Sequence, residues 1–310
     1  MKKFGFKNII VNLPSNIGDS ILALSALDKL KLNYPAANLT LICSKQTQDL
    51  FLHHPDVNKT LLFDKRWLAR QKLKFSLALR GKYDLIVDFK NSLLPLFTGG
   101  KHTPFFRKFP GGLHAKDKYL YLIKNIAKHD AKTTVEFKLT EDEKEKWKSL
   151  KIPQSILIAC ASNAIQKRYP YNLLKKLISK LTEHFPVAVL GQEKDRQFYK
   201  DILDIKGVND FVGKTKIHEV FYLLKNYARL LVCVDSSIMH IASYLDIPIV
   251  AMFGQTSVHK YGPWSKKYIV VKREDLDCAP CDNPHCQFNH ECMEIDPQLV
   301  LDAMDELMQK

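Results

Sequence analysis

Long apolar runs are missing from this sequence. No stretch reaches the roughly eighteen consecutive apolar residues from which a transmembrane helix is built. The apolar stretch near the amino terminus ends at Pro14, too soon for the hydrophobic region of a signal peptide. We therefore expect a cytoplasmic protein.

Two motifs that would indicate other functions are also absent. The first segment of the chain has the strand, loop and helix of a nucleotide-binding half but no G-x-G-x-x-G, which disfavours a dinucleotide-dependent dehydrogenase. No DNA- or RNA-reading motif accompanies the basic residues, which are spread along the chain and do not form one arm. A nucleic-acid partner is therefore not expected.

Acidic residues are outnumbered in this chain. The 33 Asp and Glu residues stand against 47 Lys and Arg, which gives a formal net charge of +14. This balance favours an anionic partner, and its spread suits a protein that works at an anionic membrane face on a phosphorylated, acidic glycolipid. For any single Lys or Arg, a solvated surface position is the alternative.

The chain is long enough for two globular domains. Its 310 residues are 46% hydrophobic and 26% charged, the composition of a globular protein. A highly charged segment at residues 135–153 interrupts the middle, and Thr140–Glu143 within it has the pattern of a capping box at a helix start. Since strand and helix patterns alternate on both sides, we predict two α/β domains, 1–150 and 151–310.

The densest pattern lies at residues 231–264. Leu231–Val234 and Ile247–Phe253 are predicted buried strands, and apolar residues at helical spacing separate them. Ligands of open α/β sheets bind outside the carboxyl ends of the strands. There the turn Asp235-Ser236-Ser237 opens the helix, whose free backbone N–H groups can bind a phosphate or another anion.

An ordered string continues from this turn: Asp235-Ser236-Ser237-Ile238-Met239-His240-Ile241-Ala242, then Phe253-Gly254-Gln255-Thr256. It resembles the donor-binding signature of the lipopolysaccharide heptosyltransferases, glycosyltransferase family 9, written D-[ST]-G-x-M-H-x-A followed by F-G-x-T. Ser237 departs from the family's Gly, so a Cβ must be accommodated where the backbone approaches a diphosphate. Taken singly, these residues have another reading, as a helix cap, a core Met and a core His.

The resemblance covers both halves of the chain and implies a fold. That fold is α/β of the GT-B type, two facing Rossmann-like domains with parallel sheets. Residues 1–150 would bind the acceptor and carry the catalytic base, and residues 151–310 would bind the ADP-sugar donor. The C-terminal helix, residues 297–308, would close the structure and could pack back toward the first domain.

The resemblance also implies an activity. It is inverting transfer of L-glycero-D-manno-heptose from ADP-heptose to the inner core of lipopolysaccharide, with no cofactor required. The segment YDLIVDFKNS, residues 83–92, is more similar to the heptosyltransferase II branch. The implied partners are the donor, the anionic core acceptor and, peripherally, the cytoplasmic face of the inner membrane. Alternatives are a GT-B enzyme that uses another nucleotide sugar, a nucleotide-sugar epimerase, and a non-catalytic glycolipid- or nucleotide-binding protein.

Site residues follow from the family's motifs. Asp19, in the loop before the first helix, matches the proposed general base, although a loop Asp is often only a helix cap. Ser162 and Lys167 match residues that reach the donor diphosphate, where a fixed ammonium stabilises a departing ADP. Glu193 follows a predicted strand, where an acidic group can accept from ribose hydroxyls. The donor site would be completed by Asp235, Ser236, Ser237 and His240.

The family places its acceptor in the N-terminal domain. Basic residues there are candidates to bind the carboxylates and phosphates of the core sugars: Lys65, Arg66, Arg70, Lys101, His102 and Arg107.

Four of the seven cysteines lie close together in the sequence. They are Cys278, Cys281, Cys286 and Cys292, and their spacing is compatible with a structural zinc site. Related heptosyltransferases have a similar segment, and the family's chemistry implies no catalytic metal. We therefore expect no metal, with structural zinc at these four residues as the alternative.

Overall fold

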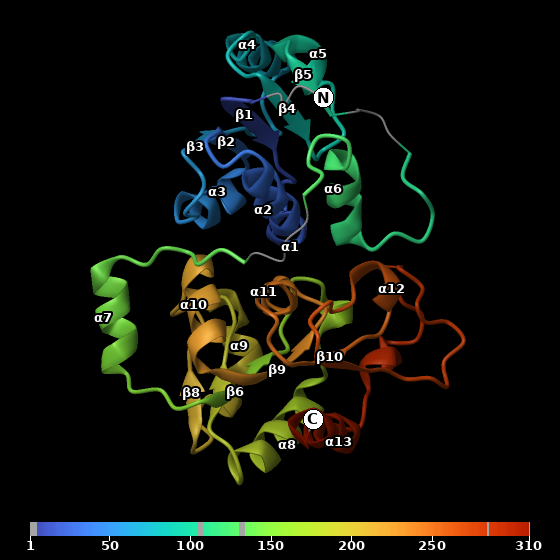
Figure 1. Cartoon of the computed structure of the whole chain (residues 1–310). Coiled ribbons are helices and arrows are strands. Elements are labelled where there is room, and N and C mark those ends of the chain that lie inside the picture. The colour runs from blue at the N-terminus through green and yellow to red at the C-terminus, as the bar shows by residue number, and fades with distance from the viewer. Residues whose placement is uncertain (1–4, 104–107, 130–133, 284, 310) are drawn as a thin grey trace. The chain divides into compact units, whose positions relative to one another are not determined.

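The computed structural model describes residues 5–103, 108–129, 134–283 and 285–309. The chain divides into two compact units, Met1–Lys138 and Leu139–Lys310. Each contains one sheet of parallel strands with helices packed on it (Figure 1). In the described part of the chain, no helix has the length and apolar character needed to span a membrane.

The N-terminal unit has a five-stranded sheet in the order β3-β2-β1-β4-β5. Every strand pair in it is parallel. The strands are β1 (Asn8–Asn12), β2 (Asn38–Cys43), β3 (Lys59–Leu62), β4 (Leu85–Asp88) and β5 (Lys101–His102). The helices are α1 (Ile17–Leu22), α2 (Leu24–Asn33), α3 (Lys45–Leu52), α4 (Ala69–Ala78), α5 (Leu94–Thr98) and α6 (Ala115–Ile123). The central strands β1 and β4 are almost wholly buried, as their unbroken apolar sequences predict.

Apolar residues at positions 21, 24, 27 and 30 predict one helix over residues 20–32, but the structure has two helices here. The helical segment begins earlier, at Ile17, and breaks at Ala23, whose amide donates to the carbonyl oxygens of Asp19 and Ile21. The apolar spacing continues across the break, because α1 and α2 both bury their apolar residues. The pattern alone therefore did not reveal it.

The C-terminal unit has a six-stranded sheet in the order β11-β10-β9-β6-β7-β8, again with parallel pairs only. The strands are β6 (Ser155–Ala159), β7 (Val187–Val189), β8 (Val208–Asp210), β9 (Ala228–Val234), β10 (Ile249–Met252) and β11 (Tyr268–Val271). The α-helices are α7 (Glu141–Ser149), α8 (Tyr171–Thr182), α9 (Arg196–Tyr199), α10 (Ile217–Tyr227), α11 (Ser237–Leu245), α12 (Val258–Tyr261) and α13 (Pro297–Gln309). Four 3₁₀ turns complete it: η1 (Ile165–Lys167), η2 (Glu193–Asp195), η3 (Lys200–Ile202) and η4 (Glu291–Met293).

Helix α13 is part of the core of the C-terminal unit. Val300, Met304 and Leu307 are buried together with residues of α8 and of the central strands, and α13 packs against α8, β10 and β11. In Figure 1 it lies beside α8. The C-terminal helix thus packs within the second unit.

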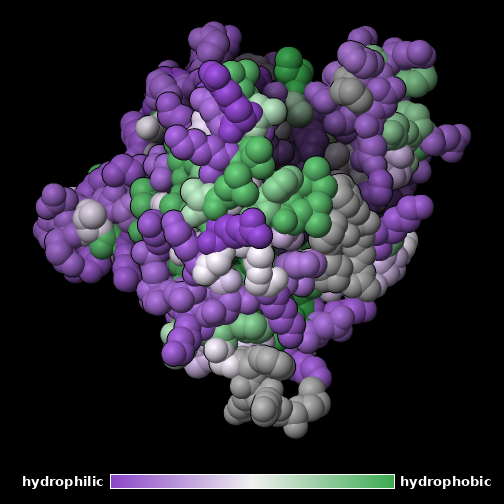
Figure 2. Space-filling model, turned by 90° about the horizontal axis from the view of Figure 1, so that it is seen from above, coloured by the Kyte–Doolittle hydropathy of each residue, from purple (hydrophilic) through white to green (hydrophobic). Residues whose placement is uncertain are grey.

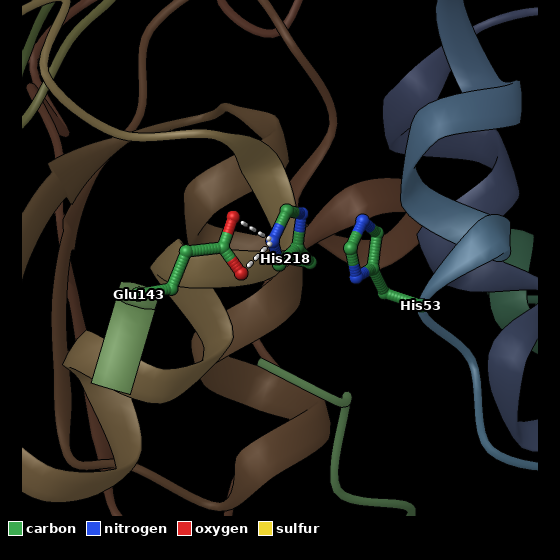
Figure 3. A group of neighbouring side chains, drawn as sticks. All are labelled: His53, Glu143 and His218. Atoms are coloured by element: carbon green, nitrogen blue, oxygen red, sulfur yellow. Dashed lines mark hydrogen bonds and ion pairs between the residues drawn. The ribbon is translucent and has the colours of Figure 1, made fainter. Parts of the chain in front are cut away.

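Helix α7 also belongs to the C-terminal unit. Its capping box is confirmed, because Glu143 donates its amide to Thr140 Oγ1 and its carboxylate accepts from the amide of Thr140. Glu143 also accepts from His218 Nε2, at 3.1 Å to each carboxylate oxygen (Figure 3). In addition, Trp147 Nε1 donates to Glu219 of α10. These contacts explain why the units divide at Lys138, before α7, whereas the sequence-based boundary of 150/151 follows it.

Candidate functional site

The strand order of the C-terminal sheet creates one position where ligands bind in such folds. From β6 the chain continues to β7 on one side, while β9 pairs with β6 on the other. The neighbouring carboxyl ends are in register, with Ala159 beside Cys233. The loop after β6 and the turn after β9 therefore open at the same edge, at the topological switch point.

An ion pair joins these two segments. Lys167 Nζ, in η1 after β6, lies 2.6 Å from Asp235 Oδ2, directly after β9. The Asp235 side chain is 7% exposed and that of Lys167 is 26% exposed. Both residues were predicted for the donor site, and the structure brings them together. An ammonium group is thus fixed at the switch point in contact with solvent.

Helix α11 presents its amino terminus at the same edge. Ser236 is its N-cap residue, and its side chain accepts from the amide of Met239. The first turn of a helix leaves amides without intrahelical partners, and its dipole favours an anion. Ser237 stands where the family has Gly. It is not one of the described residues with a positive φ, so the backbone here does not require glycine. The Cβ of Ser237 is accommodated in an ordinary helical position.

His240 lies one turn further along α11 and is buried. Its ring stacks on Trp264, with centroids 5.6 Å apart and an interplanar angle of 25°. The amide of Trp264 in turn donates to Ser243 Oγ of the same helix. This packing fixes the orientation of the imidazole, and Trp264 was not among the residues we selected from the sequence.

The loop after β6 is ordered by its own polar contacts. Ser162 Oγ accepts from the amide of Ala164, and its carbonyl oxygen accepts from Arg168 Nε at 2.7 Å. The hydroxyl of Tyr199 accepts from the amides of Cys160 and Ala161. Arg168, next to Lys167 in the sequence, is a positioning residue that we missed. Its place in the K-R-Y-P string was the available signal.

Glu193 and Asp195 have different environments after β7. Asp195 is buried and accepts from the amide of Gln192. Glu193 is exposed and packs on Gly213, where φ is +73° and an added Cβ would lie 2.0 Å from Glu193 Oε2. The exposed carboxylate of Glu193 accepts from Arg196 Nε at 3.2 Å, and its contact with a ribose stays a prediction.

Asp19 of the N-terminal unit does not cap its helix. The N-cap residue of α1 is Asn16, and Asp19 lies in the first turn with no side-chain capping bond. Its carboxylate accepts from Asn16 Nδ2 at 3.3 Å and is partly exposed. Asp19 is therefore not the N-cap residue of α1, although an acidic side chain in the first turn is favoured by the helix dipole, and its role as general base stays a prediction.

A second carboxylate at this sheet edge was missed. Asp88, at the end of β4, is buried and accepts from Asn12 Nδ2 at 2.7 Å and from Ser92 Oγ at 2.9 Å. Asn12 ends β1, so the pair spans the switch point of this sheet, where β1 adjoins β4. Asp88 thus holds the loop after β4 in place.

The predicted acceptor residues do not form one group. Lys65, Arg66 and Arg70 follow β3 at one edge of the sheet, whereas Lys101 and His102 form β5 at the opposite edge. Arg66 is bound to Asp64 at 2.7 Å. Arg107 lies outside the described residues.

The C-terminal cysteines surround the turn after β10. All seven cysteines of the chain are free, and of the four in this segment only Cys292 is buried. A Cβ added to Gly254 would lie 2.7 Å from Cys292 Sγ, which is too close for a side chain. This explains the glycine in F-G-Q-T. Among the described residues, no three of the four sulfur atoms lie within 4.8 Å of one another. The alternative of a structural zinc site stays a prediction.

Comparison with known proteins places these motifs in one family. The family model "Glycosyltransferase family 9 (heptosyltransferase)" matches residues 107–291. The chain is 26% identical to lipooligosaccharide heptosyltransferase 2 of Campylobacter jejuni, over 96% of this chain and 98% of the relative. It is 24% identical to the Haemophilus influenzae protein of the same name, over 98% and 100%.

A solved structure shows the same fold. It is that of the ADP-heptose lipopolysaccharide heptosyltransferase II of Escherichia coli, with a TM-score of 0.75 at 22% identity. The superposition covers 97% of this chain and 98% of that one. At this level of identity the likeness establishes a common architecture, in which both sheets have counterparts.

Proposed function

Because this chain belongs to glycosyltransferase family 9, the heptosyltransferase family, we propose that it transfers L-glycero-D-manno-heptose from ADP-heptose to a hydroxyl of the lipopolysaccharide inner core, with inversion. The relatives named heptosyltransferase 2 favour the second heptose as the sugar it adds. We also propose that it works in the cytoplasm, in peripheral contact with the inner membrane.

One observation supports the donor assignment most directly. A partly exposed ammonium, Lys167, lies beside the amino terminus of α11 at the switch point between β6 and β9. A diphosphate bound there would meet a fixed cation and free helix amides. Lys167 would then exchange part of its contact with Asp235 for contact with the phosphates.

The proposed reaction is a single displacement at the anomeric carbon of the heptose. The acceptor oxygen forms the new bond as its proton passes to Asp19, and the bond from the anomeric carbon to the diphosphate oxygen breaks. The charge that develops on the departing ADP is stabilised by Lys167, by Ser162 and by the amides of Ser236 and Ser237. Glu193 would accept from the ribose, and no cofactor takes part.

Lys65, Arg66, Arg70, Lys101 and His102 are proposed to attract the anionic acceptor. Since they lie at opposite edges of the sheet, we do not expect all of them to bind one sugar. Arg70, which also lines a cavity of this unit, is the one with a neighbouring site that a ligand could enter.

The experiment that tests this function measures the released nucleoside diphosphate and identifies the sugar products. Purified protein is incubated with deacylated core of defined truncation and with ADP-heptose, or with a panel of UDP-, GDP- and ADP-linked sugars. Transfer from ADP-heptose alone, to core that carries one heptose, is the expected result. Turnover with another nucleotide sugar, epimerisation without acceptor, or no turnover with any donor would contradict it.

A further inference from the structure

A large cavity opens between the sheet of the N-terminal unit and helices α4 and α5. Its volume is about 590 Å³. The walls are mostly apolar, with Phe63, Leu73, Phe75, Leu94 and Phe97 among them. Polar side chains also line it: Asn12, Lys90 and Ser92 at or after the carboxyl ends of β1 and β4, and Arg70, Lys72 and Ser76 of α4. The cavity therefore suits a ligand with a long apolar part and a polar end.

The cavity continues the apolar core of this layer. Ile42 and Leu94 belong both to the core cluster under α4 and α5 and to the cavity lining. Phe63 and Phe75 pack against the same cluster. Because apolar walls hold water poorly, an apolar ligand gains free energy by filling this space.

Apolar side chains also surround the cavity on the outside. Six residues in or directly before α4 and α5 are exposed: Leu68 (58%), Leu73 (43%), Leu77 (46%), Leu93 (48%), Leu96 (56%) and Phe97 (37%). The view onto the side of this unit that carries α4 and α5 shows a hydrophobic patch bordered by hydrophilic residues (Figure 2). Exposed apolar side chains beside basic ones can bind together at an anionic lipid interface.

The charge around the patch is mainly positive, although Arg66 is paired with Asp64. Residues 65–82 contain no Asp or Glu and seven basic residues: Lys65, Arg66, Arg70, Lys72, Lys74, Arg80 and Lys82. Inside the cavity, Lys90 Nζ lies 5.1 Å from the centroid of the Phe63 ring. Burial lowers the pKa of Lys90, opposed by Asp88, so a bound anion would be favourable there. This charge selects an anionic ligand over a neutral one.

We propose that this surface binds the anionic phospholipids of a membrane, with one acyl chain in the α4–α5 cavity and the lipid phosphate at Lys90 and the basic rim. This rests on the membrane contact of the proposed function, but it does not depend on heptose transfer. The exposed leucines supply apolar contact with the bilayer, and the cations of residues 65–82 supply the attraction to its surface.

Trp67 provides a direct signal for an occupied cavity. Its ring packs on two lining residues, with centroids 5.4 Å from Phe63 and 5.6 Å from Phe75. The test uses lysophosphatidylglycerol brominated on its acyl chain, kept below its micelle concentration, because bromine quenches indole only at short range. We expect saturable quenching in the full chain that is lost in Trp67→Phe, which keeps the other two of the three tryptophans. Unbrominated lipid should not quench.

Matched variants separate the cavity from general adsorption. Leu73→Asn should weaken binding of the probe about tenfold, the cost of losing one apolar side-chain contact. Leu299→Asn, at a leucine of α13 that is 50% exposed, should not weaken it. Lys72→Glu with Lys74→Glu should reduce binding of lysophosphatidylglycerol more than that of lysophosphatidylcholine. The charge control is Lys176→Glu with Lys206→Glu, both exposed in the C-terminal unit.

A co-sedimentation experiment with vesicles completes the test. It contains neither donor nor acceptor, so its result is independent of the transferase assay. The protein should co-sediment with vesicles of phosphatidylethanolamine and phosphatidylglycerol, and not with phosphatidylcholine alone. Absence of Trp67 quenching by the brominated chain overturns the proposal, as does equal weakening by Leu299→Asn. Binding only to vesicles that contain lipopolysaccharide also overturns it, since the cavity would then belong to the acceptor.

Discussion

At the scale of single residues, Lys167 has two proposed interactions, one with Asp235 and one with the donor diphosphate. It neutralises Asp235, whose carboxylate is nearly buried, and we propose that it also stabilises departing ADP. Removing one member of such a pair leaves the other charge without compensation, which is more costly than removing both.

The first prediction concerns this pair. Lys167→Met should lower the free energy of unfolding by about 1–3 kcal/mol, because the Asp235 carboxylate loses its partner, and should reduce kcat by about 100-fold or more. The double variant Lys167→Met with Asp235→Asn should recover most of the stability but none of the activity. Urea unfolding and ADP-release kinetics measure the two effects.

Lys176→Met, on the exposed face of α8, is the control. If the double variant recovered activity together with stability, Lys167 would act only structurally.

The second prediction concerns Asp19. Asp19→Ala should reduce transfer by about 100- to 10,000-fold, the contribution of a general base, and leave the Kd for ADP-heptose nearly unchanged. Asp49→Asn, on the exposed side of α3 in the same unit, is the matched carboxylate control. Calorimetry with donor and initial rates with saturating acceptor give both quantities. Normal turnover of Asp19→Ala removes this residue from the mechanism.

Among residues, sequence motifs identified Lys167, Asp235 and Asp19 as candidates, but not their contacts. Asp88 lies within the YDLIVDFKNS string, but the string alone did not indicate which of its residues has a role. It is the burial of its side chain against Asn12 and Ser92 that gives it a role.

At the scale of elements, the α7–α10 contact depends on the charge of Glu143. Burial favours the neutral acid, but hydrogen bonds from Thr140, Lys216 and His218 outweigh it and lower the pKa of Glu143 to about 2. A carboxyl group with a lowered folded-state pKa stabilises the protein above its unfolded pKa. That stabilisation is lost as the pH falls toward the folded value.

The third prediction follows from this shift. Between pH 4.5, the ordinary value for Glu, and about pH 2, Glu143 contributes a loss of stability as the pH falls. In this range the contribution of Glu143 to the free energy of unfolding falls by about 1.4 kcal/mol per pH unit. Glu143→Gln should be less stable than the wild type at neutral pH and should lack this part of the acid dependence. Glu145→Gln, exposed on the same helix, should keep it. Urea unfolding at several pH values decides, and identical slopes in the two variants contradict the assignment.

Buried elements were the ones that the sequence predicted well. The apolar runs at residues 8–13, 39–43 and 155–159 correspond to β1, β2 and β6 with ends that differ by no more than one residue. The strands that we did not predict, β5, β8 and β11, lie at the ends of their sheets and are largely exposed or half-buried. An edge strand packs on fewer neighbours, so its sequence is under less pressure to be apolar.

At the scale of the whole molecule, the C-terminal unit contains a complete apolar core. Residues of α8, α13 and five of its strands are buried in one cluster. The same unit holds every residue that we propose to bind the donor.

The fourth prediction is that the fragment Leu139–Lys310 folds alone and binds ADP. At a hundredfold excess of ADP over its Kd, binding should add about 2.7 kcal/mol. That corresponds to an increase in Tm of roughly 5–10 °C for a domain of this size. Thermal unfolding with and without ADP measures the shift, and the fragment with Lys167→Met is the control. A fragment that unfolds without cooperativity, or shows no shift, contradicts the prediction.

The sequence by itself determined the α/β class, the GT-B fold and the membership in glycosyltransferase family 9, all of which are confirmed. The α/β class follows from apolar strands that alternate with helices, whereas the GT-B fold and the family follow from the resemblance of the string at residues 235–256 to the signature of that family. Only the tertiary structure decided that Lys167 pairs with Asp235, that Asn12 bonds to Asp88, and that α4 and α5 enclose a cavity with a basic rim. Such contacts join residues far apart in the chain. Their energies depend on the burial and distance that folding creates, and no local pattern encodes these.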